Sequence, residues 1–273
     1  MVFVSEKSDD FVPQLRSLIQ NLQTVDSTTG PIDCSGLEWV SPLTALPLAA
    51  YLHQKGRKVT GMNSYLQTVC FPSGVDHLQN FQTGQTYFPI VRFPNSSIPL
   101  LEQLTHSFSQ LVLQSTGQVS EMIRNAWFYA VGELVTNVAE HSRSPLGWIH
   151  AQYWPTKGFL DAVVLDQGRG FKKTYEDAQK VSYTHQQAIR RALEGHSVKD
   201  DIERGRGLRT TRSLVTRSPL NGKFLIISGN CGYYADAKKQ TWLNLGTWQW
   251  NGAIIAFRIH RVTKPVDIYP YVE

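Results

Sequence analysis

The order of the apolar segments after residue 100 is the feature that most limits how this chain can fold. Two amphipathic helices are predicted first, at Leu100–Gln114 and from an N-cap at Ser120 to about His141. Two strands, a long polar connection, a third helix and two further strands follow. The strands are predicted at Gly147–Trp154, Phe159–Leu165, Phe224–Ser228 and Gly252–His260, and the third helix at Leu208–Thr216. This order predicts an α/β sandwich, a two-layer fold in which a mixed sheet carries helices on one face.

A segment rich in proline and glycine, Gly84–Pro99, separates this region from the rest. It contains one strand-like piece, Tyr87–Phe93, and it predicts a domain boundary near residue 95. The chain is therefore expected to have two domains, at residues 1–95 and 96–273, and an α+β fold overall. The first domain is predicted to alternate helices and short strands, at Phe11–Gln23, Pro31–Cys34, Leu43–Gln54 and Arg57–Met62.

Composition excludes several classes of protein. With 273 residues, 41 % of them hydrophobic, the chain can bury a core and is not predicted to be disordered. It has no apolar run of membrane-spanning length and no signal-peptide pattern at its start. The three cysteines are far apart in the sequence, which favours reduced thiols in a cytoplasmic protein. Residues 171–217 hold eleven Lys or Arg against six Asp or Glu, which is typical of a solvated loop or of a phosphate nearby.

The predicted helix that ends near His141 carries a polar stripe. Glu133, Asn137 and His141 are spaced four residues apart, so they lie along one side of the helix. Carboxylate and carboxamide oxygens suit Mg²⁺ and a positioned water molecule. The same spacing is also typical of a solvent-facing helix surface.

Two glycine patterns follow the stripe. Asp166, Gly168 and Gly170 come directly after a predicted strand, where a carboxylate can accept a hydrogen bond from an exocyclic amine and glycines let the backbone approach a flat ligand. Gly205, Gly207 and Leu208 open a predicted basic helix, whose first N–H groups suit phosphate. Taken singly, the first pattern also fits a β-turn and the second an ordinary turn into a helix.

The order and spacing of the three patterns resemble the GHKL ATP-binding superfamily over about Leu100–Arg261. The helix pattern is most similar to that of the anti-sigma-factor serine kinases. This resemblance implies that ATP and Mg²⁺ bind, with Asn137 as the metal ligand and Glu133 as the general base. It implies that Asp166, Gly168 and Gly170 form the adenine site, and that Gly205, Gly207 and Leu208 lie against the phosphates. Residues 171–204 would form a mobile lid, and His141 would either pack or cap the helix end.

One position departs from the family pattern. Many members have Gly-Thr just before the last strand, with the threonine near adenine. Here Gly246-Thr247 precedes that strand by several residues. Either the strand begins early or Ala253 replaces the threonine, so Thr247 is not predicted as a site residue.

The N-terminal domain resembles the STAS-type anti-sigma-antagonist fold over about Phe11–Phe81. The segment after its first strand, Ser41-Pro42-Leu43, places Leu43 where those antagonists carry a phosphorylated serine. The resemblance therefore implies docking rather than self-regulation by phosphorylation at that position. A generic α/β module remains the alternative.

Two kinds of function are compatible with these patterns. The first is a serine/threonine kinase or ATPase of the anti-sigma type, favoured because Glu133 is retained beside Asn137. The second is a non-catalytic switch that exposes a partner surface when nucleotide binds. The expected partners are ATP or ADP, a STAS-type or sigma-factor-like protein, and a second copy of the chain in a homodimer. Binding to nucleic acid or to a membrane is not expected, and Ser-Phe-Ser after His106 argues against a self-phosphorylating histidine kinase.

Overall fold

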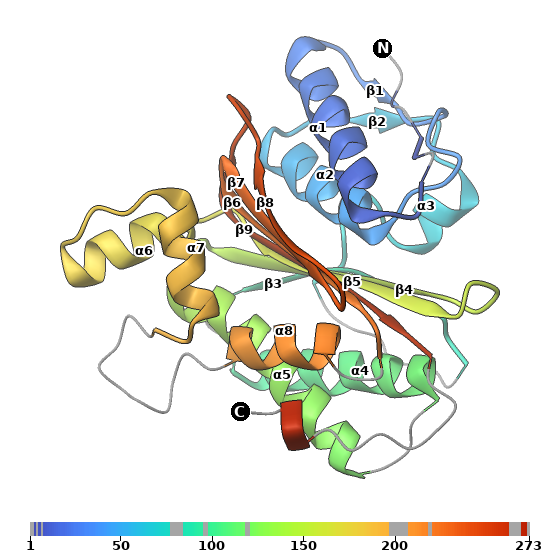
Figure 1. Cartoon of the computed structure of the whole chain (residues 1–273). Coiled ribbons are helices and arrows are strands. Elements are labelled where there is room, and N and C mark those ends of the chain that lie inside the picture. Colours follow the sequence, from blue (N-terminus) through green and yellow to red (C-terminus); the bar gives the residue numbers. More distant parts are fainter. Residues whose placement is uncertain are drawn as a thin grey trace.

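The computed structural model describes residues 3, 5–6, 8–76, 84–94, 98–117, 121–196, 207–217, 220–261 and 269–271. Its central element is a seven-stranded sheet with the strand order β3-β4-β5-β9-β6-β7-β8 (Figure 1). The strands are β3 (Tyr87–Pro94), β4 (Leu146–Trp154), β5 (Phe159–Asp166), β6 (Lys223–Gly229), β7 (Cys231–Asp236), β8 (Gln240–Asn244) and β9 (Trp250–His260).

Every pair of neighbouring strands in this sheet is antiparallel, so the expectation of a mixed sheet is wrong. The reason lies in the placement of β9. The helices between β5 and β6 form a crossover connection, so β6 runs in the same direction as β5. The last strand, β9, then inserts between the two and runs antiparallel to both.

Three helices cover one face of the sheet: α4 (Ile98–Thr116), α5 (Glu121–His141) and α8 (Gly207–Arg217) (Figure 1). Their apolar faces pack against inward side chains of the sheet. The Trp127 indole of α5, for example, stacks on Phe257 of β9 with ring centroids 5.8 Å apart. Burial of this apolar area is the main favourable contribution to the stability of the layer pair.

The N-terminal module covers the opposite face, so the sheet lies between two layers, whereas the prediction of helices on one face concerned residues 96–273 alone (Figure 1). Its elements are α1 (Phe11–Ser27), β1 (Ile32–Asp33), α2 (Pro42–Gln54), β2 (Val59–Thr60) and α3 (Ser64–Thr68). Leu18 and Leu46 share one continuous apolar core with Trp148, Leu165 and Ile254 of the sheet. Because both faces of β5 are covered, its residues do not alternate between buried and exposed, and every residue of the strand is buried.

The two predicted domains are joined by more than this core. β3 precedes the predicted boundary, yet it pairs along its length with β4. Residue 95 itself lies outside the described residues, and the boundary remains a prediction. The STAS-like interpretation of the N-terminal module likewise remains a prediction, because β1 and β2 are a parallel pair of only two residues each.

Buried and half-buried charges also connect the N-terminal module to the sheet. Arg258 of β9 and Asp161 of β5 form a bidentate pair, with N–O distances of 2.6 and 2.7 Å, and both are almost fully buried. The Arg258 guanidinium lies between the rings of Phe159 and Phe11, and Phe11 begins α1. Asp10, the N-cap of α1, also accepts a hydrogen bond from Lys223 at 2.9 Å.

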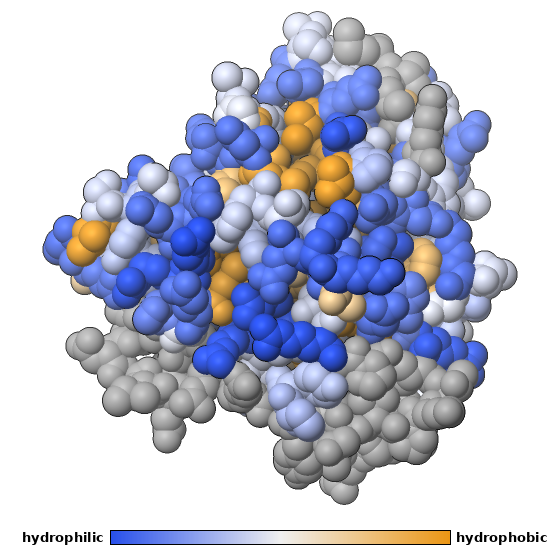
Figure 2. All heavy atoms as spheres, viewed as in Figure 1, coloured by the Kyte–Doolittle hydropathy of each residue, from blue (hydrophilic) through white to orange (hydrophobic). Residues whose placement is uncertain are grey.

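Two further helices follow β5 in the chain: α6 (Gly170–Gln179) and α7 (His185–Leu193). Together they form an arm whose visible surface is mostly hydrophilic (Figure 2). A short 3₁₀ turn at Tyr269–Tyr271 completes the described elements. No helix within the described ranges is long and apolar enough to cross a membrane.

Candidate functional site

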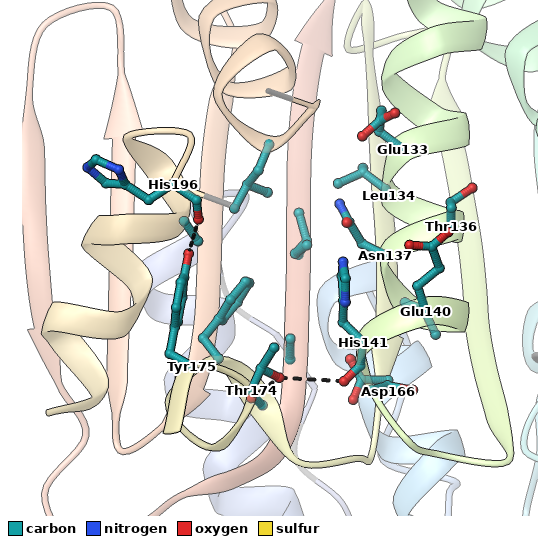
Figure 3. Close-up of a pocket in the computed structure, with 18 residues that line it drawn as sticks. Glu133, Leu134, Thr136, Asn137, Glu140, His141, Asp166, Thr174, Tyr175 and His196 are labelled. Atoms are coloured by element: carbon teal, nitrogen blue, oxygen red, sulfur yellow. Dashed lines mark hydrogen bonds between the residues drawn. The ribbon is translucent and has the colours of Figure 1, made fainter. Parts of the chain in front are cut away.

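A pocket of about 230 Å³ opens between α5, the end of β5, β9, the α6–α7 arm and the start of α8 (Figure 3). Five of the residues predicted from the sequence line it: Glu133, Asn137, Asp166, Gly170 and Leu208. These residues are spread over 76 positions of the sequence, and the fold brings them to one cavity. Its lining is partly apolar and partly polar, as expected of a small-molecule site.

Helix α5 supplies the polar stripe of the pocket. Figure 3 shows Asn137 and His141 projecting from α5 toward the pocket, whose rim also includes Glu140 of the same helix. The main-chain carbonyl of His141 accepts hydrogen bonds from Arg169 Nε at 2.8 Å and from Thr174 Oγ1 at 3.5 Å. The C-terminal end of α5 is thus tied to the segment that follows β5.

Asp166 lies at the inner end of the pocket and is 5 % exposed. Its Oδ1 accepts a hydrogen bond from Gly168 N at 2.8 Å, and its carboxylate also accepts from the backbone N–H of Ala253. Burial nevertheless outweighs these two bonds and raises the pKa of Asp166 to about 7. A buried carboxylate with remaining acceptor capacity is suited to receive a donor from a bound ligand.

The glycines of this region are required by close backbone contacts. A Cβ on Gly168 would collide with the carbonyl of Ser142, and one on Gly170 would lie 2.6 Å from Ser228 Oγ. Gly170 also has a φ of +67°, a backbone conformation that residues other than glycine rarely adopt. Gly168 does not line the pocket itself, but its N–H fixes the Asp166 carboxylate.

The start of α8 lies against Glu133. A Cβ on Gly207 would stand 2.5 Å from Glu133 Cγ and Oε2, so only glycine lets the two helices approach this closely. Leu208 adds an apolar side chain to the pocket. Gly205, the remaining predicted residue of this group, lies outside the described residues.

The α6–α7 arm supplies a wall that the sequence patterns did not predict. Its pocket residues are Phe171, Thr174, Tyr175, Ala192 and His196. Tyr175 Oη donates a hydrogen bond to the His196 carbonyl at 2.5 Å, which joins the middle of α6 to the segment that follows α7. The sequence signal was the spacing of Phe171 and Tyr175, four residues apart as on one side of a helix, but the lysines and acidic residues around them obscured it.

The predicted lid therefore contains two helices over its described residues, and residues 197–204 lie outside them. The structure also resolves the question of the last strand. β9 begins at Trp250, and Ala253 lies directly opposite Asp166 in the ladder and in the pocket. Ala253, and not Thr247, is thus the residue of this strand beside Asp166.

Residues 97–222 match the model of the histidine kinase-like ATPase domain. No curated protein matches the chain. The matched segment includes α4, α5, the Asp166 loop and α8, whereas β6 to β9 and the N-terminal module lie outside it. The match and the antiparallel sheet with its helix layer support a GHKL-type ATPase domain, which implies that this chain binds ATP.

Proposed function

We propose that this chain is a Mg-ATP-binding regulatory protein that transfers the γ-phosphoryl group of ATP to a serine or threonine hydroxyl or to water. In this proposal it is a kinase or ATPase of the anti-sigma-factor type, with a STAS-like domain fused at its N-terminus. The observation that carries it is Glu133. Its carboxylate is held against Gly207 at the start of α8 and shares one pocket with Asn137 and Asp166.

The roles follow the chemistry of each group. Asp166 would accept a hydrogen bond from the exocyclic amine of adenine, in a site shaped by Gly168 and Gly170. Gly207 and Leu208, with Gly205, would bring backbone N–H groups of the α8 start to the phosphates. Glu133 would take the proton of the attacking hydroxyl or water. The oxygen of that hydroxyl or water would bond to the γ-phosphorus, while the bond between the γ-phosphorus and the oxygen that bridges to the β-phosphate breaks and ADP leaves.

The donor set is compatible with Mg²⁺. This ion prefers oxygen ligands and is commonly held by one or two protein groups together with substrate phosphates. Asn137 offers a carboxamide oxygen on the pocket side of α5, one helical turn from the Glu133 carboxylate. When bound, Mg²⁺ would neutralise negative charge on the phosphates.

A comparison of two glutamate variants tests the catalytic role. Glu133→Gln removes the base, and Glu102→Gln removes an exposed carboxylate of α4 that does not line the pocket. We expect Glu133→Gln to bind Mg-ATP but to release ADP about 10²–10⁴-fold more slowly. Glu102→Gln should retain the parent rate. Equal ADP release from parent and Glu133→Gln would reject the proposed enzyme.

The alternative is a nucleotide-gated switch without turnover. One observation favours it: the N-terminal module contacts the loop between Asp166 and Gly170. Gln167 Nε2 in that loop donates a hydrogen bond to Gln54 Oε1 of α2 at 3.1 Å. A ligand at Asp166 could therefore change the surface that this module offers to a protein partner. Mg-ATP binding without ADP release, together with nucleotide-dependent affinity for a STAS-type or sigma-factor-like protein, would favour the switch. Location in the cytoplasm and a homodimer remain part of the proposal.

A further inference from the structure

The end of β5 is held by an unusual donor. Trp250, the first residue of β9, directs its indole Nε1–H at the main-chain oxygen of Asp166, at 2.9 Å. Trp250 is 4 % exposed and Asp166 is 5 % exposed, so water does not compete for this bond. Loss of this donor would remove a buried hydrogen bond from the Asp166 carbonyl, which is costly where water cannot replace it.

The backbone of β9 explains why this indole reaches Asp166. The regular ladder between the two strands ends at the pair formed by Asp166 and Ala253. The next residue, Gly252, has a φ of +103°, and the pairing of β9 with β6 shifts at the same point. A Cβ on Gly252 would lie 2.6 Å from Asp166 Oδ1, so only glycine permits this bend. Trp250 therefore lies beyond the last residue pair of the β5–β9 ladder, and its indole is directed back at the end of β5.

The ring of Trp250 is anchored on its other side. It belongs to the apolar core that the sheet shares with α1 and α2 of the N-terminal module. A second contact supports the bend itself, since Ser228 Oγ donates to the Gly252 carbonyl at 2.8 Å and accepts from Phe171 N at 3.3 Å. The position of Asp166 is thus set by the core on one side and by the start of α6 on the other.

We infer that Trp250 is a positioning residue for the Asp166 carboxylate, and that it sets the preference of the pocket for a purine bearing an exocyclic amine. This inference rests on the proposed function, in which Asp166 receives that amine. The indole acts through Asp166: it fixes the main chain from which the carboxylate projects. Through the shared core, Trp250 also connects the end of β5 to α1 and α2 of the N-terminal module.

The test compares two tryptophan-to-phenylalanine variants of the same core. Trp250→Phe keeps an aromatic ring but loses the N–H donor. Trp148→Phe changes the neighbouring strand β4, where Trp148 is 1 % exposed, shares the same core and does not line the pocket. Calorimetry would measure the affinity of the full chain for ATP and for ITP, in which an oxygen replaces the exocyclic amine. Thermal unfolding of the same samples would report the stability of each variant.

We expect the parent to prefer ATP over ITP. Loss of one hydrogen bond should weaken ATP binding by Trp250→Phe about two- to tenfold while ITP binding stays the same. Trp148→Phe should keep the parent ratio even if it unfolds at a lower temperature. Ser228→Ala, which removes the support of Gly252, should reduce the ratio in the same direction and serves where Trp250→Phe does not fold.

Three results would contradict parts of this inference, and each has a different meaning. An unchanged ATP-to-ITP ratio in Trp250→Phe and in Ser228→Ala would overturn the positioning role and leave the proposed function intact. A parent chain that binds neither nucleotide would instead reject the proposed function. Equal loss of ATP and ITP binding in both tryptophan variants would assign Trp250 to the stability of the core alone.

Discussion

The close approach of Gly207 to Glu133 leads to a specific prediction about the stability of a Gly207→Ala variant. A methyl group at Gly207 would lie 2.5 Å from Glu133 Cγ and Oε2, whereas carbon atoms in contact prefer about 3.5–4.0 Å. Helices α5 and α8 would have to separate by roughly 1 Å to relieve the overlap. Such overpacking costs about 1–3 kcal/mol, and the better helix propensity of alanine returns at most about 1 kcal/mol. Gly207→Ala should therefore lower the free energy of unfolding by about 1–2 kcal/mol.

The same separation should move the phosphate side of the pocket. We expect the affinity of Gly207→Ala for Mg-ATP to fall at least about tenfold. A shift of about 1 Å at the start of α8 is enough to misplace the groups that would contact the phosphates. Gly132→Ala is the matched control, since its new Cβ would lie 3.4 Å from Thr105 Cγ2, an ordinary contact in mid-helix. Urea unfolding and calorimetry would follow both variants. Parent-like stability and affinity in Gly207→Ala would refute the argument.

Three further predictions concern buried charge. Because burial raises the pKa of Asp166 to about 7 and the adenine amine prefers the ionised carboxylate, ATP affinity should fall up to about tenfold from pH 8 to pH 6; calorimetry on Asp166→Asn, expected to lack this component, is the control. Burial likewise raises the pKa of Glu6 to about 7, so its ionisation destabilises the fold as pH rises from 5 to 8. Glu6→Gln should gain stability over the parent across that range, by up to about 3 kcal/mol in urea unfolding, and a constant difference would contradict the assignment. Arg258→Met should lower the free energy of unfolding by about 3–5 kcal/mol because it leaves Asp161 buried and unpaired, and the double variant with Asp161→Leu should recover most of that loss.

Elements with strong periodic patterns were predictable from the sequence. The helix ending at His141 and the strand ending at Asp166 were each predicted within one residue of where the structure ends them. Both carry long apolar patterns with a clear polar boundary. The hairpin of β7 and β8 was missed because Gly232 and the exposed side chains of Gln240–Asn244 weaken the strand signal.

Long-range arrangement was less predictable. Nothing in the local pattern of β9 specifies that it inserts between β5 and β6, so the antiparallel character of the whole sheet depends on tertiary packing. The covering of the second sheet face by α1 and α2 was hidden for a similar reason. Continuous apolar runs such as that of β5 indicate burial on both sides, but they do not identify the covering segment.

The candidate site shows the same division. Asn137, Asp166 and Gly170 line the pocket, and motif spacing alone predicts that they lie at a helix face and a strand end. Trp250 was not found, since its contact with Asp166 depends on the bend at Gly252. Tyr175 was missed because a charged segment was interpreted as a lid. Motifs thus identified groups that would touch a ligand, whereas the groups that hold them in place required the fold.

A calorimetric titration of the full chain with Mg-ATP, beside Asn137→Ala, tests the central claim most directly. Asn137 projects from α5 toward the pocket, and its substitution removes a predicted metal ligand without filling the cavity. The account predicts saturable binding of Mg-ATP by the parent, and binding at least about tenfold weaker by a folded Asn137→Ala. Absence of Mg-ATP binding by the folded parent, or equal affinity in the two proteins, would contradict it.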